Sequence, residues 1–419
     1  MAQKFLEAGY EWTEFDQKAD VYIINTCTVT SMSDKKSRQM LRKARALNEK
    51  AIIVAVGCYA QVSKNELEKI PEIDLILGIN EKNDIVKYVE QYKTDATRIE
   101  IASDVMHQRE FLDFGEITFS EKTRAVIKIE DGCDRFCSYC IIPYARGRVR
   151  SRKPESILRE MEQLAKREIK EVVLTGIHIA SYGKDLEQNI TLIDLLEQLN
   201  QVNGIQRIRL GSLEPTIITD DFVKRVTKLE KVCNHFHLSL QSACDATLKR
   251  MNRRYTVEEF KQCIKRLRDG YHNEVTLTTD VIVGFPGETE TEFQTTLANL
   301  QEMHFTKMHV FKFSPRKGTK AFEMKEQISP EIKEKRSKKV IELSDKNERE
   351  YEKQYEGKII PVLMEKIEGN WITGHSSNYL KVCAPKMNVE NEIVMVKIEK
   401  AKKGELMGEI LTDFVTELK

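Results

Sequence analysis

Short apolar runs alternate with amphipathic helical segments along the first three quarters of the chain. Near the N-terminus, residues 21–25 and 51–56 are rich in β-branched residues and suit strands that are buried on both faces. The polar and basic residues 33–48 between them are good helix formers. This strand–helix–strand order predicts an α/β fold with a doubly wound parallel sheet.

The same alternation continues through the middle of the chain. Helical segments lie between most of its strand-like segments, and strand–helix units in series predict a partial (β/α)6 barrel, whose active site gathers at the C-terminal strand ends. Residues 329–356 are charge-dense and predict a solvated connecting helix. From Gly357, short β-prone runs separated by turn residues predict a small all-β barrel. The expected middle strands are residues 125–130, 171–176, 207–211, 235–240, 275–284 and 307–313.

This pattern predicts three domains, at residues 1–115, 119–350 and 353–418, and the length of 419 residues suits about 150 residues per domain. Apolar residues make up 41% and charged residues 32%, as in a soluble globular protein. No apolar run approaches the roughly 20 residues that span a bilayer, and no signal peptide is evident, so we expect a cytoplasmic protein without a membrane partner. The net charge of +1 neither favours nor excludes nucleic acid as a partner.

Three cysteines, Cys133, Cys137 and Cys140, form a C-x3-C-x2-C loop directly after a predicted strand. Three thiolates on one short loop can ligate three irons of a cubane cluster and leave the fourth iron open to an external molecule. A structural zinc site normally needs four ligands, and no further Cys or His lies close by in the sequence. The loop therefore favours an iron–sulfur cluster.

Two other cysteines, Cys27 and Cys58, each follow a predicted strand of the N-terminal sheet. They would lie at the C-terminal ends of adjacent parallel strands, where open α/β sheets bind ligands. Isolated cysteines are more often core residues, and spacing alone leaves both interpretations open. The remaining cysteines have no ligand spacing and are expected in the core: Cys233, Cys244, Cys263 and Cys383.

The cysteine spacing, with Tyr139 before the last cysteine, resembles the radical S-adenosylmethionine (SAM) superfamily. The resemblance implies a [4Fe-4S] cluster whose open iron chelates the amino and carboxylate groups of SAM. It also implies reductive cleavage of SAM to a 5′-deoxyadenosyl radical, and it assigns no catalytic residue beyond the cluster ligands. The positions that it implies for SAM binding are Tyr139, Thr175, Gly176, Ser212, Glu214, Gln241, Gly284 and Phe285.

The segments NTCTVT, VGCYAQ, IIPYARGRVRSR, LTGIHIASYG, HLSLQS and MNRRYT resemble the methylthiotransferases over nearly the whole chain, with a C-terminal barrel of TRAM type. This resemblance implies a second [4Fe-4S] cluster on three cysteines, two of them Cys27 and Cys58. The family's first ligand, in a Gly-Cys-x-x-Asn segment after an opening strand, has no match here. We therefore expect that the start lies upstream of Met1 or that the sequence is truncated, which puts the second cluster in doubt.

A basic run beside the cysteine loop suits contacts with RNA phosphates. Residues around Cys27 resemble the MtaB-type subfamily, which implies methylthiolation of C2 of N6-threonylcarbamoyladenosine at tRNA position 37 with two SAM per turnover. The implied partners are the tRNA anticodon loop, a reducing electron donor and a sulfur donor. Open alternatives are isopentenyl-adenosine in tRNA, a ribosomal-protein aspartate, or a cluster-bearing RNA-binding protein without catalysis. The basic run comprises Arg146, Arg148, Arg150, Arg152 and Lys153.

Overall fold

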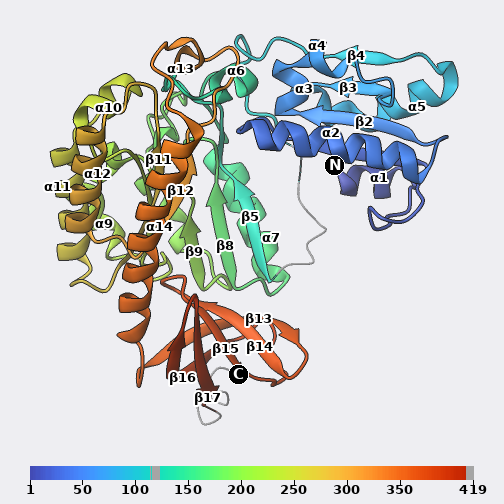
Figure 1. Ribbon diagram of the computed structural model, residues 1–419. Coiled ribbons are helices and arrows are strands. Elements are labelled where there is room, and N and C mark those ends of the chain that lie inside the picture. Colours follow the sequence, from blue (N-terminus) through green and yellow to red (C-terminus); the bar gives the residue numbers. More distant parts are fainter. Residues whose placement is uncertain (114, 116–122, 412–419) are drawn as a thin grey trace. The chain divides into compact units, whose positions relative to one another are not determined.

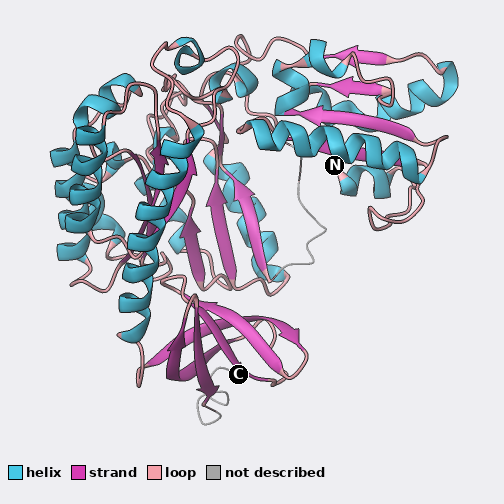
Figure 2. Ribbon diagram, in the orientation of Figure 1, coloured by secondary structure: helices cyan, strands magenta, loops and turns pink. Residues whose placement is uncertain are grey.

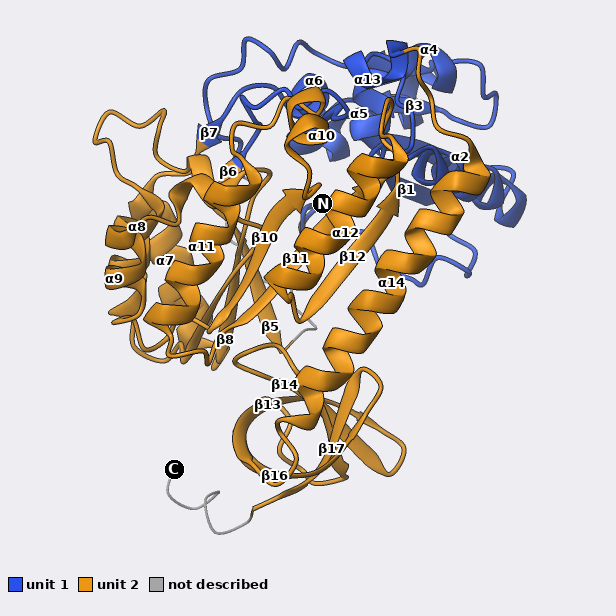
Figure 3. Cartoon of the chain, turned by 60° about the vertical axis from the view of Figure 1, so that its left-hand side comes forward, with its two compact units in different colours: residues 1–119, 131–150, 314–324 blue, residues 120–130, 151–313, 325–419 orange. Residues whose placement is uncertain are grey.

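The computed structural model describes residues 1–113, 115 and 123–411, and the predicted domain boundaries at 119 and 418 lie outside these residues. Among the described residues, no helix combines the length and apolar character needed to cross a bilayer. Figure 3 colours two compact units of the chain. Unit 1 comprises residues 1–119, 131–150 and 314–324, and unit 2 comprises residues 120–130, 151–313 and 325–419.

Unit 1 is built on a parallel sheet with the order β1-β2-β3-β4, of which Figure 1 labels β2, β3 and β4. Alternate residues of β2 enter different cores: Ile53 packs with residues of α2, whereas Val54 packs with residues of α5. Helices thus cover both faces of the sheet, which confirms the predicted doubly wound arrangement. The elements of unit 1 are α1 (Ala2–Glu7), β1 (Val21–Thr26), α2 (Ser31–Leu47), β2 (Ile52–Gly57), α3 (Cys58–Val62), α4 (Lys64–Leu67), β3 (Leu75–Leu77), η1 (Asn80–Asp84), α5 (Ile85–Asp95), β4 (Ile99–Ile101), α6 (Ile142–Arg146) and α13 (Lys320–Glu323).

Unit 2 contains parallel strands that follow one another in chain order. The sheets β5-β8-β9 and β10-β11-β12 are joined by Leu213, whose backbone N–H donates to His237 (2.8 Å) and whose carbonyl accepts from Ser239 (2.9 Å). This confirms the predicted partial (β/α)6 barrel. Its elements are β5 (Arg124–Lys128), α7 (Pro154–Lys166), β8 (Glu171–Thr175), η2 (Ile179–Ser181), α8 (Leu192–Asn200), β9 (Arg207–Leu210), η3 (Pro215–Ile217), α9 (Asp220–Val226), β10 (His235–Gln241), α10 (Asp245–Arg250), α11 (Val257–Gly270), β11 (Thr276–Val283), α12 (Glu290–Met303), β12 (Lys307–Lys312) and α14 (Pro330–Lys353). Two short strands, β6 (Glu130–Asp131) and β7 (Arg150–Ser151), lie where the chain passes between the units.

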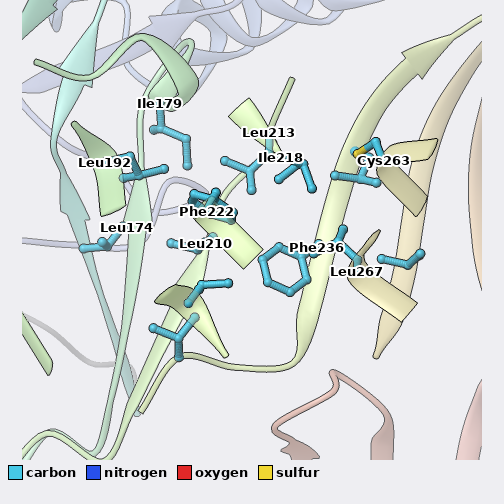
Figure 4. Close-up of a cluster of buried hydrophobic side chains, with 14 of the residues drawn as sticks. Leu174, Ile179, Leu192, Leu210, Leu213, Ile218, Phe222, Phe236, Cys263 and Leu267 are labelled. Carbon is cyan, nitrogen blue, oxygen red and sulfur yellow. The ribbon is translucent and has the colours of Figure 1, made fainter. Parts of the chain in front are cut away.

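The curved sheet of unit 2 has two different faces. One face buries alternate apolar residues such as Leu174, Leu210 and Phe236 against the helices in one large core (Figure 4). Successive side chains of a strand point to opposite faces, so the residues between these apolar positions lie on the other face, here called the inner face. Most of them are polar or aromatic. Inner-face residues include Thr175, Arg209, His235, His237, Asp280, His309 and Phe311.

The C-terminal part of unit 2 is a closed barrel with the strand order β13-β14-β15-β17-β16, visible as a separate group of strands in Figure 2. It buries its own apolar core, which includes Val362, Val382 and Val396. The structure thus confirms the predicted small all-β barrel. Its strands are β13 (Ile359–Glu368), β14 (Trp371–Ser376), β15 (Lys381–Pro385), β16 (Ile393–Lys402) and β17 (Glu405–Ile410).

A buried charge network joins this β-barrel to the inner face of the curved sheet. Glu171 is fully buried and accepts a hydrogen bond from Arg209 Nε at 2.8 Å, with Arg207 Nη1 at 3.7 Å. Arg207 also donates to the carbonyl oxygen of His375, and Arg209 to that of Ser377, both at 2.9 Å. One buried carboxylate is therefore shared by two arginines that hold the β14–β15 turn.

Candidate functional site

The cysteine loop lies directly after β6, in unit 1. Cys133, Cys137 and Cys140 are all partly exposed, and none of them forms a disulfide. The backbone N–H of Cys133 donates to the carbonyl of Gly147 (3.0 Å), and that of Cys140 donates to the carbonyl of Cys137 (2.9 Å). The first cysteine is thus tied to the end of α6, and the last two lie on one turn.

The donor set of this loop fits a cubane cluster. Three thiols lie within eight residues, and in a cubane each thiolate binds a different iron. Within the described ranges, no three His, Cys, Asp or Glu side chains are gathered as they would be around a single metal ion. The loop therefore fits the cluster by the type and number of its donors.

Gly132 fixes the entry of the chain into the cysteine loop. Its φ of +83° lies in the region that favours glycine, and a Cβ atom there would lie 1.9 Å from the carbonyl oxygen of Arg148. We expect Gly132→Ala to distort the loop, to cost roughly 2 kcal/mol or more of local stability, and to lower the iron bound per chain after anaerobic reconstitution. Gly9→Ala is the matched control, because Gly9 has a φ of +85° and no atom within 4 Å of its Cβ position. Equal iron contents in the two variants would contradict this expectation.

The two N-terminal cysteines follow paired residues of adjacent strands. Thr26 of β1 is in register with Gly57 of β2, so Cys27 and Cys58 both come one residue after this pair. Cys27 is exposed and Cys58 is buried. Among the described residues, no other cysteine follows a strand of this sheet. The sheet thus brings together two of the three ligands that the resemblance implies.

Within unit 1, Arg146 connects the cysteine loop to Cys58. Arg146 Nε donates to Cys58 Sγ at 3.2 Å, and Nη1 lies 3.4 Å from Asp131 Oδ2. Burial by itself would lower the pKa of Arg146, but its interactions with Cys58 and Asp131 raise it above its usual value. Ala145 packs beside Cys58 in a small apolar cluster with Val105. No spacing in the sequence could show this contact, because it joins residues that are 88 positions apart.

A second arginine holds the segment next to Cys27. Arg316, from the short part of unit 1 that follows β12, forms an ion pair with Asp34 at 2.7 Å and donates to the hydroxyl of Thr28. Both Asp34 and Arg316 are buried. Segments that are far apart in the sequence therefore fix the loops that follow β1 and β2.

The positions implied for SAM binding in unit 2 lie at strand ends. Thr175 is the last residue of β8 and Gln241 the last of β10, whereas Gly284 and Phe285 follow β11. Phe285 is fully buried, and its ring packs against Phe313 with ring centroids 5.2 Å apart, so its side chain is not available to a ligand in this structure. Ser212 is exposed after β9, and Tyr139, on the cysteine loop of unit 1, is partly exposed.

Glu130 and Glu214 form buried acidic positions at the same end of unit 2. Glu130 Oε2 accepts a hydrogen bond from the backbone N–H of His178 at 2.7 Å and lies 2.7 Å from the position of a Cβ atom on Gly176. Glu214 lies 3.3 Å from His178 Nε2 and 3.5 Å from Arg253 Nη2. Sequence reasoning missed Glu130, although an acidic pair directly before a cysteine loop is a visible signal.

The predicted RNA-binding run is only partly available at the surface. Arg150 and Arg152 are buried, Arg150 beside Asp131 (3.6 Å) and Arg152 in an ion pair with Glu160. Both side chains thus lie beside carboxylates inside the fold, and neither is exposed to an RNA phosphate in this structure. Arg148 and Lys153 are exposed, and Arg146 is partly buried.

Comparisons with known proteins agree with this architecture. The model of the radical SAM superfamily matches residues 127–300, and that of the uncharacterized protein family UPF0004 matches residues 1–78. The structure of the radical SAM methyltransferase TsrM from Kitasatospora setae has a TM-score of 0.52 and 15% identity, and the match covers 74% of this chain and 67% of that one. At this identity the likeness shows the fold alone.

Curated relatives are much more similar in sequence. The threonylcarbamoyladenosine tRNA methylthiotransferase MtaB of Bacillus subtilis is 41% identical over 95% of this chain and 90% of its own, and that of Aquifex aeolicus is 38% identical over 91% and 92%. The tRNA-2-methylthio-N(6)-dimethylallyladenosine synthase of Clostridium novyi is 34% identical over 96% and 91%. The chain belongs to the methylthiotransferase family of radical SAM enzymes.

Proposed function

We propose that the chain methylthiolates C2 of N6-threonylcarbamoyladenosine at position 37 of tRNA. The observation that carries this proposal is the 41% identity, over 95% of the chain, to a relative named for that nucleoside. Relatives named for the dimethylallyl nucleoside match a similar share of the chain, but they are only 34 to 35% identical to it. The three-thiol loop supports the radical SAM part of the reaction.

In this proposal, Cys133, Cys137 and Cys140 hold a [4Fe-4S] cluster, and the chemistry that it supplies when bound is one-electron reductive cleavage of SAM. Such chemistry suits an aromatic C–H bond, which has no usable acidity for proton-transfer catalysis. The residues proposed to bind SAM are Tyr139, Thr175, Gly176, Ser212, Glu214, Gln241, Gly284 and the backbone of Phe285.

The proposal also includes a second [4Fe-4S] cluster, for which Cys27 and Cys58 are two of the three ligands that the resemblance implies. Their positions after paired residues of adjacent strands support it, as does the contact of Arg146 with the Cys58 sulfur. Iron counting after anaerobic reconstitution tests this part: two clusters require about eight irons per chain. About four irons, unchanged in a Cys27→Ala variant, would contradict the second cluster.

The proposed partner is the tRNA anticodon loop, which presents its bases unpaired, as sequence-specific recognition of RNA requires. Exposed Arg148 and Lys153 are the proposed phosphate contacts of the basic run, and the C-terminal β-barrel is a second proposed RNA-binding element. The reaction also needs a reducing electron donor and a sulfur donor, and we place it in the cytoplasm, where tRNA is modified.

Expression in a strain that lacks its own threonylcarbamoyladenosine methylthiotransferase tests the function. Mass spectrometry of nucleosides from total tRNA should then detect 2-methylthio-N6-threonylcarbamoyladenosine, and a Cys137→Ala variant should not produce it. Appearance of only the isopentenyl derivative would reassign the substrate. Absence of any methylthio nucleoside, with normal expression and full cluster content, would refute the proposed function.

A further inference from the structure

A hydrogen-bonded chain of side chains crosses the inner face of β10 and β11. His235 Nε2 lies 3.1 Å from Thr278 Oγ1, and His237 Nδ1 lies 2.9 Å from the same hydroxyl. The other ring nitrogen of His237 lies 3.2 Å from Asp280 Oδ2. The Asp280 carboxylate therefore stands at the end of an ordered chain rather than on a freely rotating side chain.

The base of this chain is anchored by the β-barrel. The ring of Tyr379 stacks on His235, with centroids 5.1 Å apart, and the Arg209 guanidinium lies 4.6 Å from the Tyr379 centroid. Burial lowers the pKa of His235 to about 3, so its imidazole is neutral near pH 7. A neutral, buried ring with a stacked neighbour is a fixed end for the chain that leads to Asp280.

Asp280 itself is still accessible. Its side chain is 27% exposed, and that of His237 is 14% exposed. On the neighbouring strand β12, His309 is in register with Asp280, and Phe311 is in register with Ile282. A carboxylate with a fixed orientation and an open side is an acceptor for N–H donors of a ligand.

The inner face of β12 adds two exposed aromatic residues, His309, the cross-strand partner of Asp280, and Phe311, two residues further along the strand. Phe311 is 48% exposed, and His309 is also exposed. The neighbouring side chains still remove part of the water around His309, and this partial desolvation lowers its pKa and favours the neutral ring. Proteins bind unpaired bases by stacking them on exposed aromatic side chains and by hydrogen bonds to their edges. A stacking surface next to an oriented acceptor has both parts of such a site.

We propose that Asp280 and Phe311 form a binding site for an adenine ring, in which Asp280 accepts a hydrogen bond from the exocyclic N–H and Phe311 stacks on the base. His237 is then a positioning residue that orients Asp280. The site deepens the proposed function, on which it rests, by assigning the residues that bind the target base of tRNA. SAM also carries an adenine ring, so the experiment has to separate the two sources.

The proposed hydrogen bond between Asp280 and the base is tested by changing both partners, the protein at Asp280 and the RNA at position 37. Two anticodon stem-loop RNAs that differ only at position 37, adenosine or purine riboside, are titrated into the reconstituted full chain and followed by fluorescence anisotropy. We expect the unchanged protein to prefer adenosine about tenfold, since a hydrogen bond to a charged group is lost with the exocyclic amine. Asp280→Ala, which removes the acceptor, should abolish this preference, and Asp280→Asn, whose amide oxygen accepts only a neutral hydrogen bond, should reduce it. Asp221→Asn, a change at an exposed carboxylate on α9, should retain it.

The stacking surface and the positioning residue have their own variants. Phe311→Ala should weaken binding of both RNAs by about tenfold, whereas Ile341→Ala, which truncates a 43%-exposed apolar residue of α14, should not. His237→Ala should reduce the adenosine preference, and His237→Gln, which can still donate to Asp280, should restore part of it. A purely structural role of His237 would lower the melting temperature without changing this preference.

Equal binding of the two RNAs by the unchanged protein, or an undiminished preference in Asp280→Asn, would overturn the proposal. Equilibrium dialysis with SAM is the second arm: a loss of SAM affinity in Asp280→Asn, with the RNA preference intact, assigns the site to the cofactor and also overturns it. Failure of the proposed function is a separate result, because it is read from tRNA nucleosides rather than from binding. An adenosine preference that depends on Asp280 supports the binding site whether or not the methylthio nucleoside is found in tRNA.

Discussion

Cys137→Ala is expected to reduce the release of 5′-deoxyadenosine from SAM and dithionite to background. Cys137 is the middle cysteine of the loop, and a cubane held by only two thiolates loses a protein ligand that no neighbour in the loop can replace. The iron content after reconstitution should fall by about four irons per chain. Both quantities are measured on the same anaerobic sample, by liquid chromatography and by a colorimetric iron assay.

Cys244→Ala is the control for this variant. Cys244 is also a cysteine without a disulfide, but it is buried at the start of α10, away from the strand ends of the N-terminal sheet and from the cysteine loop in the sequence. It should retain its iron and its 5′-deoxyadenosine release. A Cys137→Ala protein that still cleaves SAM at the rate of the unchanged protein would remove the loop from the reaction.

Glu171→Ala is expected to cost about 3 to 5 kcal/mol of unfolding free energy, the typical effect of removing one partner of a buried ion pair. Glu171 is fully buried, and its loss leaves Arg207 and Arg209 without their shared counter-charge. Because the same arginines hold the β14–β15 turn, we also expect faster hydrogen exchange in that turn. Urea denaturation followed by circular dichroism measures the first effect, and mass spectrometry the second.

The matched control for Glu171 is Glu197→Ala. Glu197 pairs with Arg225 at 2.7 Å, but its side chain is 43% exposed. Exposed pairs contribute at most about 1 kcal/mol. We therefore expect Glu171→Ala to lower the unfolding free energy by roughly three times as much as Glu197→Ala, or more. Similar losses of unfolding free energy in both variants would mean that burial does not determine how much the Glu171 network contributes to stability.

The order and type of the main elements could be predicted because the apolar pattern is local. The strand expected at residues 171–176 is β8 (Glu171–Thr175), and the helix expected at residues 33–48 is α2 (Ser31–Leu47). Parallel strands that are buried on at least one face read as β-branched runs, and amphipathic helices between them keep a period near 3.6 residues. The positions of the cysteines after strands follow from the same pattern.

Side-chain environments could not be predicted in the same way. Arg150 and Arg148 look alike in the sequence, yet Arg150 is fully buried beside Asp131 and Arg148 is exposed. Partners such as Glu160 for Arg152, or Cys58 for Arg146, are set by tertiary packing. A run of basic residues therefore indicates charge, but it does not indicate which side chains reach solvent.

The ion pair of Arg316 with Asp34 also has a consequence for folding during synthesis. Arg316 lies 288 residues after Thr28 in the sequence, so these contacts form only after residue 316 has been synthesised, and until then the buried Asp34 carboxylate lacks this partner. Domains generally fold as they emerge, beginning at the N-terminus. Because residues 314–324 belong to unit 1, we expect this unit to complete its buried contacts only late in translation.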